Sequence, residues 1–186
     1  MESAEFTHTI AVYASATADG DPDWAKVMTN VGMVLARNNV RMVCPAGDGM
    51  LCRPLVTSAR SAGGTVLLIA DSALDDASVP SGVLVEIVDE VHARRQRISD
   101  LAEAFIGLPC TLTAIQSLYA SWILSGGGES GKPVALLNRN RAFEVFRGYT
   151  NDVLSQGLEN ADRLMMFSEN FDELWGKLRR TLGATD

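Results

Sequence analysis

Apolar runs rich in β-branched residues alternate with amphipathic segments along the whole chain, and this alternation restricts the fold more than any other feature. It is typical of a parallel sheet with helices on both faces. The predicted strands are 9–14, 41–44, 65–69, 83–88, 104–108, 134–137 and 164–167, and the predicted helices are 23–37, 51–62, 91–103, 113–124, 143–156 and 172–182. We expect one doubly wound, Rossmann-like α/β domain over residues 1–186, with a mostly parallel sheet of about seven strands.

Composition limits the classes of function. A length of 186 residues with 47% hydrophobic and 21% charged residues suits one domain with a sizeable core. The net charge of -7 argues against nucleic acid as a partner, because a phosphate backbone requires a basic face. Three cysteines (Cys44, Cys52 and Cys110) and two histidines favour neither a disulfide framework nor a zinc site. Without a signal peptide or a bilayer-spanning run, we expect a cytoplasmic protein with no membrane partner, metal or cofactor.

The residue pattern of segment 104–114 predicts a buried strand, a sharp turn and the first turn of a helix. A helix start binds anions well, because its unpaired N–H groups and its dipole both favour negative charge. Phosphate loops normally have glycines at such a turn, whereas Cys110, Thr111 and Thr113 stand here instead. The two threonine hydroxyls can still donate hydrogen bonds to a phosphate. We therefore predict a phosphate site with altered chemistry, beyond the carboxyl ends of the strands.

Five segments, taken in order, resemble the LONELY GUY (LOG) family over nearly the whole chain. They are Val12-Tyr13, 43–50, 92–95, 104–109 and 132–138. The resemblance implies a Rossmann-like fold and hydrolysis of the N-glycosidic bond of nucleoside 5′-monophosphates, notably cytokinin riboside monophosphates. It also implies a homodimer or a larger homo-oligomer with sites near the dimer interface.

The resemblance assigns the ligand-binding and catalytic positions one by one. Arg94 and Arg95 match the family's Arg-Lys pair, Pro109 matches the proline of the Pro-Gly-Gly-x-Gly-Thr-x-x-Glu motif, and Gly47 lies in a second glycine cluster. Residues of other types fill the motif's remaining positions: Cys110, Thr111 and Thr113 replace glycines, Ala114 replaces the threonine, and Ser117 replaces the catalytic glutamate, with Gln116 beside it.

Loss of the glutamate bears directly on catalysis. Cleavage of a ribosyl bond builds positive charge on the sugar, which a nearby carboxylate stabilises. Neither Ser117 nor Gln116 supplies a negative charge, and a slip of one residue only exchanges them. By comparison with loss of one oxyanion-hole donor, this costs ~100- to 1000-fold in rate or more. The leading hypothesis is a LOG-like protein that binds a nucleotide or another phosphorylated small molecule, with hydrolysis weak or lost.

Other functions remain open. An active phosphoribohydrolase would need a carboxylate from elsewhere, and Glu86, Asp48 and Glu129 are candidates. A carrier is another possibility, because molybdenum cofactor carrier proteins resemble the same scaffold. A third is a structural homo-oligomer or the partner of an active paralogue.

Three motifs also have simpler readings. Arg94 and Arg95 have side chains that can bind an anion such as phosphate. They are equally expected on a solvent-exposed helix face, where they would pair with acidic neighbours. The segment 126–133 resembles a P-loop, but Pro133 stands where a hydroxyl residue binds magnesium, and the expected strand and helix are reversed, which favours a turn. Cys110 precedes a helix start, which can lower a thiol pKa; a covalent role competes with simple packing.

Overall fold

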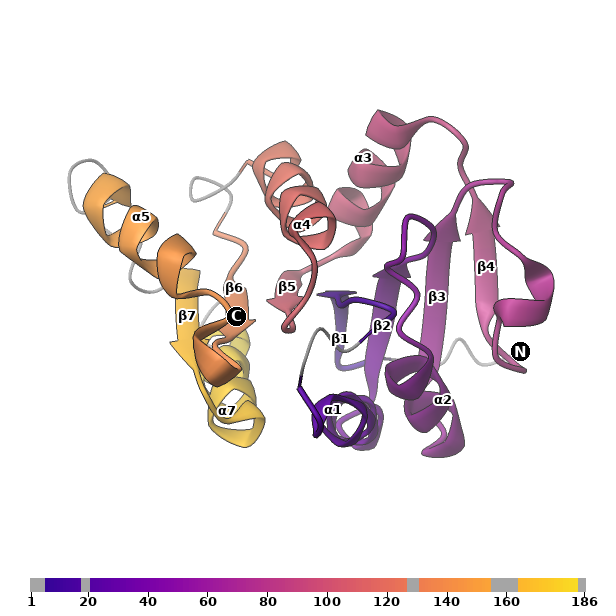
Figure 1. Ribbon diagram of the computed structural model, residues 1–186, viewed down its shortest axis with the longest axis horizontal. Helices are drawn as coiled ribbons and strands as arrows, with labels where there is room; N and C mark the ends of the chain where they lie inside the picture. Colours follow the sequence, from indigo (N-terminus) through magenta and orange to yellow (C-terminus); the bar gives the residue numbers. More distant parts are fainter. Residues whose placement is uncertain (1–5, 18–20, 127–130, 155–163, 184–186) are drawn as a thin grey trace.

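The computed structural model describes residues 6–17, 21–126, 131–154 and 164–183 (Figure 1). Its strands are β1 (His8–Tyr13), β2 (Val40–Pro45), β3 (Thr65–Ala70), β4 (Leu84–Ile87), β5 (Ala104–Gly107), β6 (Val134–Leu137) and β7 (Met165–Ser168). Its helices are α1 (Trp24–Arg37), α2 (Arg53–Ser61), α3 (Val91–Leu101), α4 (Leu112–Leu124), α5 (Glu144–Leu154) and α7 (Phe171–Gly183), with short 3-10 turns η1 (Asp76–Ser78) and η3 (Arg139–Arg141).

The seven strands form one sheet in the order β4-β3-β2-β1-β5-β6-β7, and every pair is parallel. This confirms the predicted Rossmann-like α/β class. All predicted strands and helices within the described residues are present, with ends that differ by no more than two residues. The two 3-10 turns were not predicted, because a three-residue turn carries no hydrophobic period.

Two hydrophobic cores lie on opposite faces of the sheet. Helices α1, α2 and α7 cover one face, and α3, α4 and α5 cover the other (Figure 1). Successive side chains of β1 alternate between the two faces. Ile10 and Val12 belong to the first core, and Ala11 and Tyr13 belong to the second. Strands buried on both faces explain why the apolar runs are continuous rather than alternating.

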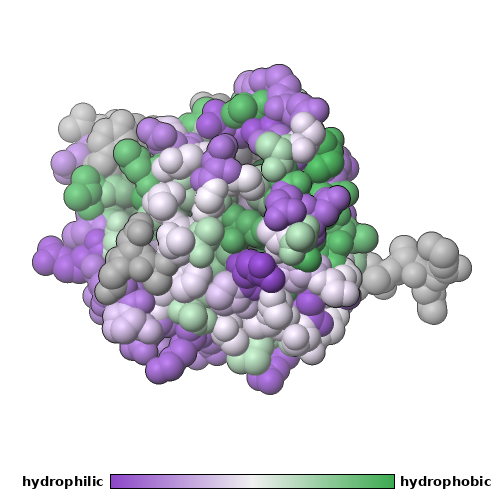
Figure 2. Space-filling view, turned by 45° about the vertical axis from the view of Figure 1, so that its right-hand side comes forward, coloured by the Kyte–Doolittle hydropathy of each residue, from purple (hydrophilic) through white to green (hydrophobic). Residues whose placement is uncertain are grey.

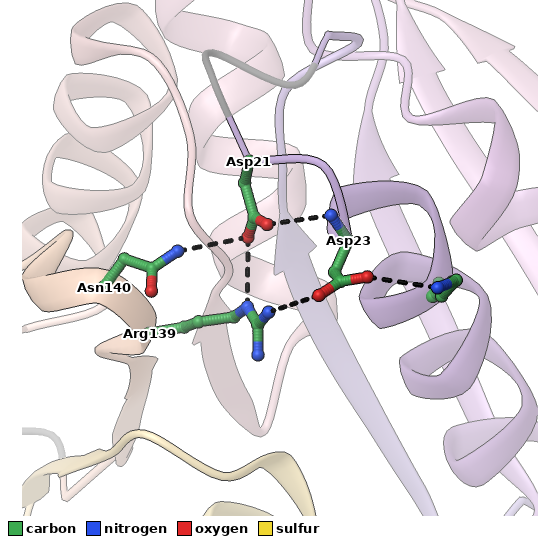
Figure 3. A network of polar contacts seen from close by, with 5 residues as sticks. Asp21, Asp23, Arg139 and Asn140 are labelled. Atoms are coloured by element: carbon green, nitrogen blue, oxygen red, sulfur yellow. Dashed lines mark hydrogen bonds and ion pairs between the residues drawn. The ribbon is translucent and has the colours of Figure 1, made fainter.

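An ionic network joins the start of α1 to η3. The Asp21 carboxylate accepts hydrogen bonds from Arg139 Nε at 3.0 Å and from Asn140 Nδ2 at 3.4 Å (Figure 3). Arg139 also contacts Asp23 at 3.4 Å. The hydrogen bond from Arg139 is the main reason that the pKa of Asp21 lies below its ordinary value. The network therefore links the β1–α1 connection to the chain that follows β6.

The depressed pKa of Asp21 predicts a pH-dependent effect of Arg139→Ala. A carboxyl whose pKa is lower in the folded state stabilises the fold above its unfolded pKa, and this stabilisation is lost as the pH falls through the folded pKa. We expect Arg139→Ala to lower Tm by about 1–3 °C at pH 7 and to have little effect near pH 2. Calorimetry at both pH values, with Arg53→Ala as an exposed control, tests this; an equal loss at both would contradict the ionic account.

Candidate functional site

A small cleft opens beside the carboxyl ends of β2 and β3, under the starts of α3 and α4. Its volume is about 60 Å³. The strand order reverses between β1 and β5, which is where ligands bind in folds of this kind. The cleft is lined by Pro45, Ala46, Asp48, Met50, Ile69, Val91, Arg94, Arg95, Ile98, Thr113, Gln116 and Ser117. Residues predicted from three separate segments, 94–95, 113 and 116–117, therefore share one cleft.

The turn before α4 is fixed by a contact that sequence reasoning missed. The Thr111 N–H donates to Ser15 Oγ at 2.6 Å, and Ser15 is buried just beyond the end of β1. Thr111 is the N-cap of α4, because its hydroxyl accepts from the Ala114 N–H at 3.4 Å. The helix thus begins at Leu112, one residue earlier than predicted. The Leu112 and Thr113 N–H groups remain without intrahelical acceptors, as at any helix start.

Arg94 has partners within the protein. Its Nη1 donates to the carbonyl oxygens of Val88 at 2.8 Å and Asp89 at 2.6 Å, and its Nη2 lies 3.5 Å from Asp71 Oδ2. The side chain is only 12% exposed. Arg94 therefore joins the start of α3 to the ends of β3 and β4, and these contacts occupy part of the donor capacity that an anion would need.

Gly47 lies beside this ion pair at the turn after β2. Its φ of +103° is one that residues with a side chain rarely adopt, and a Cβ there would lie 3.4 Å from Asp71 Oδ2. Gly47 thus shapes the turn of which Pro45, Ala46 and Asp48 line the cleft. Pro109 is half-buried at the turn between β5 and α4 and is not among the lining residues.

Arg95 differs from its neighbour. Its Nε is buried and has no hydrogen-bond partner within the described residues. Its charge acts on Tyr13, whose buried hydroxyl donates to Ser121 Oγ at 2.7 Å. Burial raises the pKa of Tyr13 far above its ordinary value, so the phenol stays neutral. The residues that line the cleft carry charge at the two arginines and at Asp48 and are otherwise uncharged.

Comparisons with known proteins come from sequence and from structure. A cytokinin riboside 5'-monophosphate phosphoribohydrolase of Rhodococcoides fascians is 24% identical over 152 residues, 80% of this chain and 77% of the relative. A probable cytokinin riboside 5'-monophosphate phosphoribohydrolase of Oryza sativa subsp. japonica is 28% identical over 181 residues, 91% of this chain and 76% of the relative. The chain is thus similar, at low identity, to proteins of the LOG type. No protein-family model matches the sequence.

The fold has further relatives among solved structures. The molybdenum cofactor carrier protein of Chlamydomonas reinhardtii superposes with a TM-score of 0.67 at 15% identity, and the match covers 95% of this chain and 98% of that one. At this identity the likeness concerns the fold. A LOG-like fold thus has relatives described both as hydrolases and as a cofactor carrier.

Ser117, which the family resemblance assigns to the position of the LOG glutamate, is buried and lines the cleft, and its hydroxyl also interacts with Tyr13. Gln116 lines the same cleft on the preceding position and is exposed. Among the candidate carboxylates, Asp48 lines the cleft. Glu86 instead binds Arg97 through contacts of 2.7 and 3.1 Å. Glu129 lies outside the described residues, as do positions 127–130 of the P-loop-like segment.

Two further findings concern possible cofactors and membranes. In the described part of the chain, no group of three or more His, Cys, Asp or Glu side chains is arranged to hold a metal ion. None of the helices described combines the length and apolar character that crossing a bilayer requires.

The surroundings of Cys110 favour the packing alternative over a covalent role. Burial raises the pKa of this thiol to about 12, because a buried thiolate loses its hydration. Cys110 packs against the core on the α4 side of the sheet and is half-buried. The two other thiols are buried, and their pKa values are also raised. A nucleophilic role for Cys110 is therefore disfavoured.

This predicts that Cys110 is inert at neutral pH. With so little thiolate at pH 8, Cys110 should react with iodoacetamide about 1000-fold more slowly than a free cysteine. Mass spectrometry of the intact protein measures this, with Val145→Cys as the control because Val145 is 91% exposed. Labelling of Cys110 as fast as that control would contradict the burial that the structure assigns to it.

Proposed function

We propose that the cleft binds the phosphate of a small molecule, such as a nucleoside 5'-monophosphate, and that hydrolysis of its glycosidic bond is weak or lost. The supporting observation is the convergence of Arg95, Thr113 and the start of α4 on one cleft where Ser117 takes the place of the LOG glutamate. Such a protein would serve as a carrier, a sensor or a partner subunit.

Anion binding is supported by three groups. Arg95 has a buried Nε without a partner in the described residues, and a buried donor of this kind gains from an anionic acceptor. The start of α4 adds unpaired N–H groups and the positive end of its dipole. Thr113 is exposed and lines the same cleft.

The other predicted residues would act less directly. Arg94 would act mainly by holding α3 in place, with its remaining N–H donors near the ligand. Pro109, Cys110, Thr111 and Gly47 would shape the backbone around the phosphate.

The size of the cleft supports a phosphate more directly than a whole nucleotide. Sites for small molecules usually enclose about 300–1,000 Å³. The present volume of about 60 Å³ suits a phosphate group, so a sugar and a base would lie in the open mouth or require side chains such as Met50 to move. We infer that affinity comes mainly from the phosphate.

An active phosphoribohydrolase is the second candidate. The observation that favours it is Asp48, a carboxylate that lines the same cleft as Ser117. Asp48 is exposed and has a φ of +49°, a conformation that costs energy for most residues with a side chain. If Asp48 stabilised the sugar cation, base release would be measurable and Asp48→Asn would abolish it.

By likeness to the LOG relatives, we propose that the protein is cytoplasmic and forms a homodimer or a larger homo-oligomer, without a nucleic acid or membrane partner. Its acidic net charge of -7 supports the exclusion of nucleic acid.

Binding is tested by thermal shifts with AMP and with inorganic phosphate. At 100 times Kd a ligand adds about 2.7 kcal/mol, which corresponds to a rise in Tm of roughly 5–10 °C for a chain of this size. Arg95→Ala should weaken AMP binding by about 10- to 100-fold, since it removes a charge-assisted hydrogen bond. Arg37→Ala, on the exposed end of α1, is the matched control. A flat response of the native protein to both ligands would contradict the proposal.

Catalysis is tested by restoring the carboxylate. With AMP and isopentenyladenosine monophosphate as substrates, the native protein should release free base barely above background. Ser117→Glu should raise this rate by about 100-fold, because it returns a charge that stabilises the sugar cation. Gln116→Glu, at an exposed position of the same cleft, is a second variant in case the buried change disturbs folding. Fast release by the native protein would refute the loss of activity.

A further inference from the structure

Strand β4 ends the sheet with an unusually apolar edge. Among the strands that the structure describes, β4 pairs only with β3. Leu84 is 54% exposed, Val85 39% and Ile87 50%. Edge strands in monomeric proteins are normally protected by charges, prolines or bulges, because an unpaired edge recruits other strands. Figure 2 brings this side of the molecule forward, and hydrophobic side chains gather on its right-hand part among hydrophilic ones.

The backbone of β4 has a defined outward side. The Val88 N–H donates to the Ala70 carbonyl at 2.7 Å, so Val88 and, by alternation along the strand, Glu86 direct their amide groups toward β3. Val85 and Ile87 therefore direct theirs away from the sheet. No hydrogen bond joins these outward amides to another part of the chain that the structure describes. Two residues thus offer unpaired donors and acceptors, and both also expose apolar side chains.

We propose that β4 pairs antiparallel with β4 of a second copy, about a two-fold axis that passes through Glu86. In this register Val85 of one copy lies opposite Ile87 of the other, so that the outward amides of both residues exchange hydrogen bonds. The side chains of Val85 and Ile87 lie on the same face of the sheet, and the pairing places them in contact. The two sheets become one continuous sheet across the axis.

A second copy suits this edge because the edge is complementary to itself in hydrogen bonding, as an interface between two identical surfaces requires. On the opposite face of the sheet, the register brings the Glu86 carboxylates of the two copies together. Each arrives with Arg97, whose Nε and Nη2 lie 2.7 and 3.1 Å from it. Both side chains are partly exposed, at 35% for Glu86 and 43% for Arg97. The two guanidiniums offset the repulsion between the two carboxylates, which lie directly opposite one another in this register.

The interface is small, which sets the expected affinity. Stable interfaces generally bury more than about 1,000 Å², and a strand of four residues offers only a short edge. We therefore expect association in the micromolar range that depends on concentration. This inference does not rest on ligand binding in the cleft.

Sedimentation velocity between about 5 and 200 μM tests the surface. The native chain should associate, and Ile87→Lys or Val85→Lys should raise Kd at least 10-fold, because a buried lysine opposes edge pairing. Val145→Lys, which removes a 91% exposed apolar side chain on α5, should leave Kd unchanged. A native chain that stays monomeric at 200 μM, or lysine variants that associate like the native chain, would overturn the proposal.

A disulfide tests the register itself. In the proposed pairing the two Glu86 residues form a non-hydrogen-bonded pair with Cα atoms about 4.5 Å apart, within the range of a disulfide. Oxidised Glu86→Cys should therefore form a covalent dimer on a non-reducing gel. Val145→Cys and the native chain are the controls. Glu86→Cys that folds, as judged by circular dichroism, yet cross-links no more than Val145→Cys would also overturn the proposal.

Discussion

The hydrogen bond from the Thr111 N–H to the Ser15 hydroxyl joins the two strands between which the strand order reverses. The chain leaves β1 toward α1 on one face of the sheet and leaves β5 toward α4 on the other. Because the two connections leave on opposite faces, a space opens at the carboxyl ends of β1 and β5. The hydrogen bond to Ser15 holds the start of α4 beside this space. The position of the start of α4, and with it the positions of Thr113 and Ser117, follows from this anchor. The rest of the cleft is built around it.

The two adjacent arginines have different surroundings at the carboxyl edge of the sheet. Arg94 binds the backbone after β4 and lies close to Asp71, so its contacts stabilise the fold around the cleft. Arg95, one residue on, has a buried Nε without such a partner in the described residues. A positively charged group thus remains for a ligand, whereas Ser117 and Gln116 provide no negative charge. This difference between the two arginines underlies our proposal that the cleft binds a phosphate without the group that stabilises a sugar cation.

Much of this architecture was predictable because it depends on local patterns. Continuous apolar runs such as 65–69 marked strands buried on both faces, and the alternation with helices implied parallel pairing. The grouping of 94–95 with 113 and 116–117 followed from the family resemblance. Ser15 was missed because a single serine after a strand carries no pattern, and its role depends on a residue 96 positions away. The partners of Arg94 and the burial of Cys110 also arise from long-range packing.

The most direct measurement is a crystal structure of the native protein soaked with AMP. The account predicts continuous density for intact AMP, with its phosphate between the Arg95 guanidinium and the N–H groups at the start of α4. Density for ribose phosphate without its base would show that the bond is cleaved and would contradict the proposed loss of hydrolysis. An empty cleft, or AMP bound elsewhere, would contradict phosphate binding at the start of α4.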